Sequence, residues 1–361
     1  MSYGPGRAEL TLALHSLAAE SASGVSAAID LADGSAFTGG CGPRSLAYLD
    51  LDVTAASGMG SVTSSGTTPP TVTVSGTPAQ AVSLVVQCTL AGALGVWAGR
   101  WSPDGGQTWT AFTSSASVAL GAMGLTMAIA AGNAATDNAW ASSTPTLALA
   151  LETSRDGALW HKTVPLAVDD AGRLPSNAIG SFDAVAVAGW QRRAFLDLDR
   201  YVRVVWTIIG SGASFTFALS GSALLVYARL RDAASLAMRA GALGNLSVEE
   251  VADQLVAASD QADQKLGARF DLPLAAWGMG VAKHTGSIFA LNAMGARGYA
   301  PEPGARDTWK DGYDRAMDFF DEVFTRGDPS IKDQTPSPAD DFQVGGINPP
   351  QREWTSRGWA R

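Results

Sequence analysis

The spacing of apolar residues changes once along this chain, near Tyr227, and this change constrains the fold more than any other feature. Before Tyr227, short runs alternate between apolar and polar residues, which is typical of β-strands with one exposed face. After Tyr227, apolar residues recur every three or four positions, as on one face of an α-helix. The sequence therefore predicts an α+β multidomain chain with β-sandwiches first and helices second. The alternating runs are 48–53, 71–74, 147–152, 195–198, 201–206 and 215–219.

The β-rich part is too long for one small sandwich. Two stretches rich in Ser, Gly, Thr and Pro, residues 57–70 and 141–146, have the composition of flexible linkers. They bracket residues 58–144, which are predicted to form a β-sandwich inserted into an outer sandwich made of residues 10–57 and 145–228. Insertion at a loop tip is tolerated because loop-closure entropy rises slowly with loop length.

A small helical domain is predicted over residues 229–329, with its clearest helix starting at Ser247. Ser247 and Glu250 have the spacing of a capping box, in which each side chain satisfies the other residue's backbone N–H. Pro273 ends this element. The apolar stripe of the helix that starts at Ser247 is Val248, Val251, Leu255, Ala258, Ala262 and Leu266. Further helices are predicted at 232–240, 277–296 and 306–325. The inward residues of helix 277–296 are Val281, Ile288 and Leu291. One face of helix 306–325 carries Trp309, Tyr313, Met317, Phe320 and Phe324.

The two ends of the chain lack a periodic apolar face. Residues 1–9 are predicted to be an N-terminal tail, and the proline-rich residues 330–361 an extended C-terminal arm. Tryptophan and arginine, which alternate near the end of the arm, are the residues most enriched at interface hot spots. The arm is therefore a candidate interface, and the alternative is a disordered tail. The candidate interface residues are Arg352, Trp354, Arg357 and Trp359.

Composition excludes several broad classes of function. The chain of 361 residues has a net charge of −9, so it cannot neutralise many phosphates, and a general nucleic-acid-binding role is disfavoured. No apolar run is long enough for a membrane span, and the first residues lack the pattern of a signal peptide. Cys41 and Cys88 are too few to indicate a redox compartment, and two buried thiols are favoured over one disulfide.

One local motif matches the Asp box, S-x-D-x-G-x-T-W, at Ser102, Asp104, Gly106 and Trp109, and residues 154–160 are a looser echo. In such a turn the Asp side chain caps the backbone, Gly takes a positive φ and Trp folds back over the strands. The functional alternative is a sialidase-like glycosidase. That chemistry needs two positioned carboxylates, together with an arginine cluster and a tyrosine nucleophile that the sequence does not assemble, so a structural turn is favoured.

Other chemical motifs are weak, and we expect no enzyme, metal site or cofactor. The three histidines lack zinc-ligand spacing, and there is no phosphate-binding loop or nucleophile elbow. Trp97, Trp101 and Trp109 could line a sugar-binding face, although core tryptophan is commoner in a sandwich. Aspartates give acidic edges, for which solvated faces are favoured over calcium sites. They are Asp30, Asp33, Asp50, Asp52, Asp169, Asp170, Asp197 and Asp199.

Residues 255–274 resemble the motif of tailed-bacteriophage head–tail connector (adaptor) proteins, in which a helix has the pattern ALxxASxxIDxYLxxRYxLPL. The resemblance extends over residues 228–329, less than a third of the chain. Parts of the β region also resemble β-modules of phage structural proteins. The motif residues here include Leu255, Ala257, Ala258, Ser259, Asp263, Leu266, Arg269, Phe270, Leu272, Pro273 and Leu274.

The resemblance implies a structural protein of the virion neck, made in the host cytoplasm. Connector proteins of this family form a ring, usually of twelve copies, between the portal protein and the tail or a tail-completion protein. The ring extends the channel through which genomic DNA passes without sequence-specific binding, and an acidic surface suits this role because it does not grip DNA. The β domains would project as a collar. The alternative is a carbohydrate-binding or host-attachment module of a phage particle.

Overall fold

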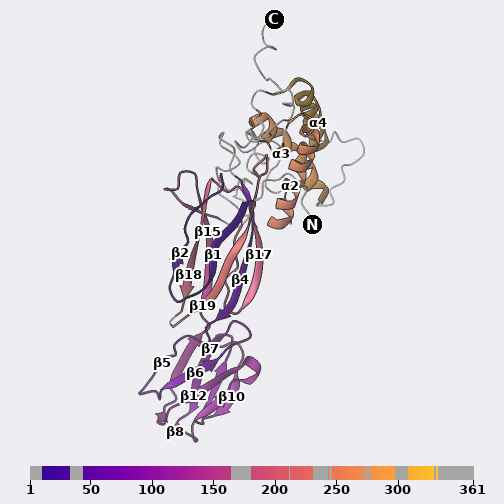
Figure 1. Ribbon diagram of the computed structural model, residues 1–361. Helices are drawn as coiled ribbons and strands as arrows, with labels where there is room; N and C mark the ends of the chain where they lie inside the picture. Colours follow the sequence, from indigo (N-terminus) through magenta and orange to yellow (C-terminus); the bar gives the residue numbers. More distant parts are fainter. Residues whose placement is uncertain are drawn as a thin grey trace.

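In the residues that a computed structural model describes, the protein is mostly β-sheet, and three α-helices follow the sheets in the sequence, as the predicted α+β class requires. Figure 1 places the helices at one end of the molecule, one sandwich in the middle and further sheets at the other end. The predicted tail, the arm, Cys41 and the helix at 232–240 lie outside the described residues. The structure describes residues 10–32, 44–163, 180–210, 212–230, 243, 246–270, 272, 274, 277–296, 308–328 and 331.

The middle of the molecule, here named the first sandwich, combines strands from residues 10–56 and 146–224. One sheet has the strand order β1-β19-β4-β17, and the other has the order β16-β15-β18-β2, with β3 also paired to β18. Alternation explains the two faces of β4, where Leu49, Leu51 and Val53 are buried and Asp52 is exposed. The strands are β1 (Leu10–Glu20), β2 (Gly24–Val25), β3 (Ile29–Asp30), β4 (Leu46–Ala56), β15 (Thr146–Ser154), β16 (His161–Lys162), β17 (Gly189–Phe195), β18 (Tyr201–Ile209) and β19 (Phe215–Leu224).

The far end of the molecule, here named the second sandwich, is built from strands of residues 63–143. All the described ladders of these strands are made within this segment. Its core contains Trp97, Trp140 and Met127 and shares no residue with the core between the sheets of the first sandwich. The strands are β5 (Thr63–Ser65), β6 (Val72–Gly76), β7 (Ser83–Leu90), β8 (Gly92–Ala93), β9 (Ala98–Ser102), β10 (Thr110–Thr113), β11 (Ser117–Ala119), β12 (Leu125–Ile129), β13 (Asn133–Ala134) and β14 (Ala139–Ser143), with a 3-10 turn at Gly121–Met123.

The helical domain contains α2 (Val248–Leu266), α3 (Met279–Ala296) and α4 (Thr308–Arg326). The predicted capping box is confirmed: the Glu250 N–H donates to Ser247 Oγ at 3.1 Å, and the Ser247 N–H donates to the Glu250 carboxylate at 2.7 Å. Reciprocal satisfaction of two backbone donors explains why the helix starts at this point. The other two helices begin two residues later than the apolar pattern predicted.

The predicted inward faces need two corrections. Phe324 was expected to pack inward, but it is 43% exposed, and the inward face of α4 runs through Ala316, Phe320 and Val323 instead. Residue 324 is rotated by about 40° from Phe320 around the helix, and it lies in the last turn. In α3, Val281 and Ile288 are fully buried, whereas Leu291 is only half-buried. The side chain of Trp309 lies outside the described part.

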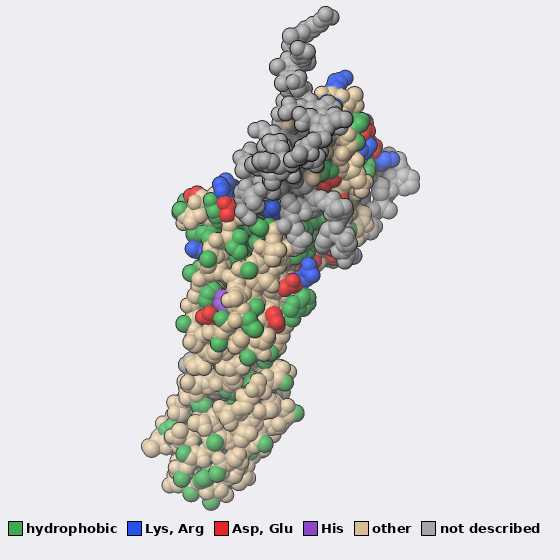
Figure 2. Space-filling model, viewed as in Figure 1, with side chains coloured by type: hydrophobic (Ala, Val, Ile, Leu, Met, Phe, Trp, Pro, Cys, Tyr) green, Lys and Arg blue, Asp and Glu red, His purple; other side chains and the backbone are tan. Residues whose placement is uncertain are grey.

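Charge is distributed unevenly along the molecule. Figure 2 shows charged side chains gathered around the helical domain and the first sandwich, and hardly any on the second sandwich. The sequence explains this, because residues 58–144 contain only three charged residues, Arg100, Asp104 and Asp137. None of the described helices is both long and apolar enough to cross a membrane.

Candidate functional site

The connector-like motif gathers around Tyr227, which lies three residues after the end of β19 at Leu224 and is 2% exposed. The Tyr227 N–H donates to Ser259 Oγ at 3.2 Å, and its hydroxyl donates to the Asp263 carboxylate. The hydroxyl also accepts from the Leu274 N–H at 3.3 Å, and the Tyr227 carbonyl accepts from Trp277 Nε1 at 3.0 Å. Three motif residues therefore hold the point where the chain leaves the β region. Sequence reasoning named those residues but missed Tyr227 as their partner.

The other motif residues build the core and tie the helices together. Leu255, Leu266 and Phe270 are buried in the core that α2, α3 and α4 share. The Arg269 guanidinium donates to the carbonyl of Phe324 in the last turn of α4, where a cation also complements the negative end of the helix dipole. Pro273 lies outside the described residues.

Gly267 follows the end of α2. Its N–H donates to the Asp263 carbonyl at 2.8 Å and continues the helical bonding. A Cβ at this position would lie 3.0 Å from that carbonyl and 3.0 Å from Leu272 Cδ1. A larger side chain would force Leu272 to move, so the glycine is matched to the packing of Leu272 in this chain.

The helical domain is joined to the first sandwich by a common core and by hydrogen bonds. The Tyr48 hydroxyl of β4 donates to Asp253 of α2 at 2.6 Å, and the Ala194 N–H of β17 donates to the Glu249 carboxylate at 3.3 Å. The two parts therefore have little freedom to move relative to one another. Core residues from the sandwich are Leu46, Tyr48, Ala194, Leu196, Leu224, Leu225, Val226 and Tyr227, and they pack with buried residues of all three helices.

A strained residue supports the same joint. Asp197 is buried and has a φ of 56°, a left-handed conformation that non-glycine residues seldom adopt. Its carboxylate accepts from the Leu230 N–H at 2.6 Å. The nearby Asp199 is within 3.2 Å of Arg155 Nε and 3.6 Å of an Arg229 nitrogen. The local strain is thus compensated by bonds that fix the start of the helical domain.

The Asp-box turn of the second sandwich satisfies its aspartate internally. Asp104 accepts hydrogen bonds from the Ser102 hydroxyl at 2.6 Å, the Thr108 hydroxyl at 2.6 Å and the N–H groups of Gln107 and Thr108 at 2.9 Å. These donors, led by the two hydroxyls, hold the pKa of Asp104 well below its usual range. The carboxylate is therefore a structural cap and is poorly suited to act as a general acid or base.

The remaining residues of this turn complete the hairpin. Gly106 has a φ of 104°, and its N–H donates to Ser102 Oγ at 2.7 Å. The Trp109 ring folds back over the hairpin and lies 4.2 Å from the Arg100 guanidinium, which also bonds to Gln87. The four residues picked out from the sequence are thus brought together in one turn.

The looser echo at residues 154–160 has the same architecture in the first sandwich. Asp156 accepts from the N–H groups of Leu159 and Ala158 at 2.9 and 2.8 Å and from Ser154 Oγ at 3.0 Å, and these bonds lower its pKa. Trp160 again stacks under an arginine, Arg203, at 4.0 Å. The structure thus uses the turn twice, at the end of a strand in each sandwich.

The tryptophans proposed for a sugar-binding face do not form one. Trp97 is fully buried and Trp101 is 8% exposed, and both pack in the core of the second sandwich. Only Trp109 of the three is partly open, and it is covered by Arg100. The exposed tryptophan of the first sandwich is Trp190 on β17, with 62% of its surface accessible. Alternation alone cannot distinguish these cases, because buried and exposed tryptophans both occur in alternating runs.

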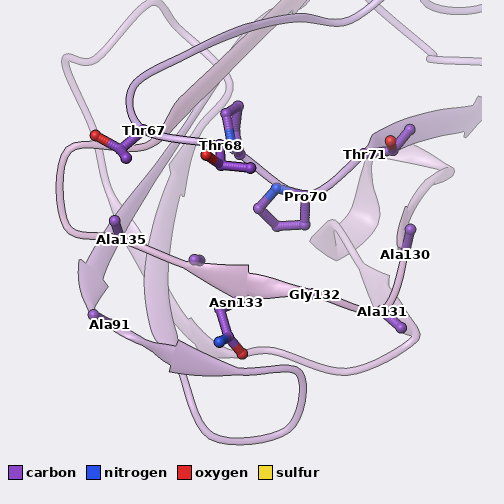
Figure 3. A pocket seen from close by; sticks show the side chains of 12 residues that line it. Thr67, Thr68, Pro70, Thr71, Ala91, Ala130, Ala131, Gly132, Asn133 and Ala135 are labelled. Carbon is purple, nitrogen blue, oxygen red and sulfur yellow. The ribbon is translucent and has the colours of Figure 1, made fainter.

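A hollow of about 500 Å³ lies in the second sandwich, and Figure 3 shows the side chains that line it. Its rim is held in place, because the Thr67 N–H and hydroxyl both donate to Asp137 and Trp140 Nε1 donates to the Pro70 carbonyl at 3.0 Å. Thr68 has a φ of 47°. The lining residues come from 67–71, Ala91 and 130–135, and they are Thr, Pro, Ala, Gly and Asn, so the hollow has no acid or base for catalysis.

Other candidate chemical groups are accounted for by packing. Cys88 is a free, buried thiol whose pKa is raised by burial. His284 stacks on Phe319 with 4.2 Å between ring centroids, and burial lowers its pKa. Within the described ranges, no three His, Cys, Asp or Glu side chains come together as a metal site would require. The aspartates Asp33, Asp169 and Asp170, and the arm residues Arg352, Trp354, Arg357 and Trp359, lie outside those ranges.

Comparison with known proteins gives little further information. No family of known proteins and no curated protein matches the chain. Among solved structures, there is a similarity to the VP16-VP17 complex, a complex of the two major capsid proteins of bacteriophage P23-77. It has 11% sequence identity and a TM-score of 0.16, and it covers 61% of this chain and 99% of that chain. A likeness this weak carries no argument about fold or function.

Proposed function

We propose that the protein is a structural component of a phage neck, a head–tail connector whose β-sandwiches project from a ring of helical domains. The observation that carries the proposal is the convergence of Ser259, Asp263 and Leu274 on Tyr227. It supports the resemblance because these motif residues act together as one unit in three dimensions. In this proposal the protein is not an enzyme and needs no cofactor.

The arrangement of the domains fits such a role. Helices at one end and two sandwiches in line beyond them give a shape that can contribute its helices to a ring and its sandwiches to a collar. The proposed ring has twelve copies, lies between the portal and a tail or tail-completion protein, and extends the DNA channel. The net charge of −9 supports sliding of DNA over binding.

Two finer parts of the proposal concern segments of the chain. Residues 58–144 are proposed to be an independent inserted domain, which the closed set of strand ladders in the second sandwich supports. Residues 330–361 are proposed to lie against the portal or an adjacent subunit, with Trp354 and Trp359 as anchors. Truncation after Ser330 tests the arm: the truncated protein should fail to join portal-containing particles, and unchanged incorporation would show that the arm is not an assembly element.

Native mass spectrometry and negative-stain imaging of the purified chain, alone and with portal-containing particles, test the ring. Wild-type protein should join particles as a ring at the neck. Leu255→Asp places an uncompensated charge in the helical core and should abolish both helicity and incorporation. Gln264→Asp, at an exposed position of the same helix, is the matched control and should retain both. Wild-type protein that remains outside the particles would refute the connector proposal.

A further inference from the structure

The outer face of the first sandwich carries an exposed aromatic platform beside a carboxylate. Trp190 on β17 pairs directly with Asp52 on β4, and Arg192 pairs with Asp50 one step further along. Trp190 is 62% exposed, Asp52 is exposed, and Arg192 lies 4.0 Å from Asp50. An indole exposed to this extent is unusual, because tryptophan is normally largely buried.

A hollow of about 230 Å³ opens next to this platform, where the two sandwiches meet. Two of its lining residues, Ala188 and Thr54, lie two residues from Trp190 and Asp52 respectively. Side chains two apart on a strand point to the same side and are separated by about 7 Å, so Thr54 shares the face of Asp52. Thr77 and Pro78 of the second sandwich line the opposite side. Binding sites occur preferentially at such junctions between domains.

We infer that this hollow and Trp190 together form a binding site for a neutral, pyranose-containing glycan. The flat indole offers a surface on which the apolar face of a sugar ring can stack, and the Asp52 carboxylate beside it accepts hydrogen bonds from sugar hydroxyls. The small Ala188 and Thr54 side chains leave room for a ring beside the indole.

The charges around the site select the class of glycan. Of the charged side chains that share this face of β4 and β17, Arg192 is paired with Asp50, so Asp52 is left as the excess charge. A negative site repels sialic and uronic acids and accepts neutral sugars. This inference is independent of the connector proposal, because it concerns the side of the molecule and needs no ring.

The test is binding of the full chain to immobilised dextran, laminarin and chito-oligosaccharides, with alginate as the anionic comparison, followed by titration calorimetry with the best binder. Trp190→Ala should weaken binding about tenfold or more, and Trp190→Phe, which keeps an aromatic ring, should weaken it less. Leu90→Ala is the matched control, since Leu90 is similarly exposed, at 58%, but lies on the second sandwich. Trp190 is too exposed for its loss to unfold the domain.

Each outcome decides the assignment. Binding of a neutral glycan that Trp190→Ala weakens and Leu90→Ala leaves unchanged supports it. Absence of binding to all three neutral glycans, a preference for alginate, or undiminished binding by Trp190→Ala would overturn it. If Trp190→Ala instead reduces self-association in native mass spectrometry and no glycan binds, the platform is a contact between copies. Ring formation by the wild-type chain tests the connector proposal separately. A chain that forms rings but binds no neutral glycan would overturn the glycan site and leave the connector proposal standing.

Discussion

Replacing Tyr227 with phenylalanine removes a single oxygen from the centre of the connector-like motif. That oxygen donates to the Asp263 carboxylate and accepts from the Leu274 N–H at 3.3 Å. The aromatic ring at position 227 remains and keeps its edge-to-face contact with Trp277, at 5.0 Å between ring centroids. The substitution therefore tests the hydrogen bonds and leaves the packing in place.

The expected loss of stability follows from the two bonds. A hydrogen bond to a charged group contributes about 1.5–3 kcal/mol, and a neutral one about 1 kcal/mol. Asp263 is half-buried, so water can replace part of the lost interaction. We therefore expect the free energy of unfolding of the helical domain to fall by about 2–3 kcal/mol.

Denaturation followed by helical circular dichroism measures this loss, because the three described helices all belong to the domain in question. Tyr201→Phe is the control, since the described residues offer no hydrogen-bond partner to that hydroxyl, and it should change stability by less than about 0.5 kcal/mol. If Tyr227→Phe unfolds at the same denaturant concentration as the wild type, Tyr227 is not the centre of the motif.

Three further changes test other parts of the structure. Gly221→Ala would place a Cβ 2.0 Å from the backbone carbonyl of Tyr48, so thermal unfolding should show a loss of about 3 kcal/mol. Burial, with a smaller contribution from Lys283, lowers the pKa of His284, so the unfolded chain binds the proton more readily than the folded chain. The free energy of unfolding should therefore fall as the pH drops below about 6.5, and His284→Gln should remove that part of the pH dependence. Replacing residues 58–144 with a short Gly-Ser bridge should leave a soluble, folded remainder by circular dichroism, and insoluble protein would show that this segment is not an independent domain.

The features that the sequence predicted well are those whose interactions are local. The capping box of α2 is formed by Ser247 and Glu250, three residues apart, so the pattern contains both partners. The same is true of the Asp-box turn, where Asp104 receives all its described hydrogen bonds from residues 102–108. Alternation likewise predicted five of its six strands, because the period of two follows from backbone geometry. The sixth prediction, residues 195–198, is wrong: β17 ends at Phe195, and the chain bends at Asp197, which has a φ of 56°.

The features that the sequence did not reveal depend on distant partners. Tyr227 is bonded to Ser259 and Asp263, which are 32 and 36 residues away, and no spacing rule connects a strand end to a helix face. The exposure of Trp190 and the burial of Trp97 also depend on which side of a sheet is covered. Sequence alternation gives two faces but does not say which one another layer will cover.

The cores of the three parts determine where the molecule can bend. The helical domain and the first sandwich share one continuous core, so rotating one against the other would expose apolar surface. The two sandwiches have separate cores that share no residue. Bending at the junction between them exposes less apolar surface, so the second sandwich is the part that can swing. The hollow beside Trp190 lies at the same junction and is lined by residues of both sandwiches. A ligand bound in it would therefore restrict the movement of the second sandwich and couple binding to the orientation of that sandwich.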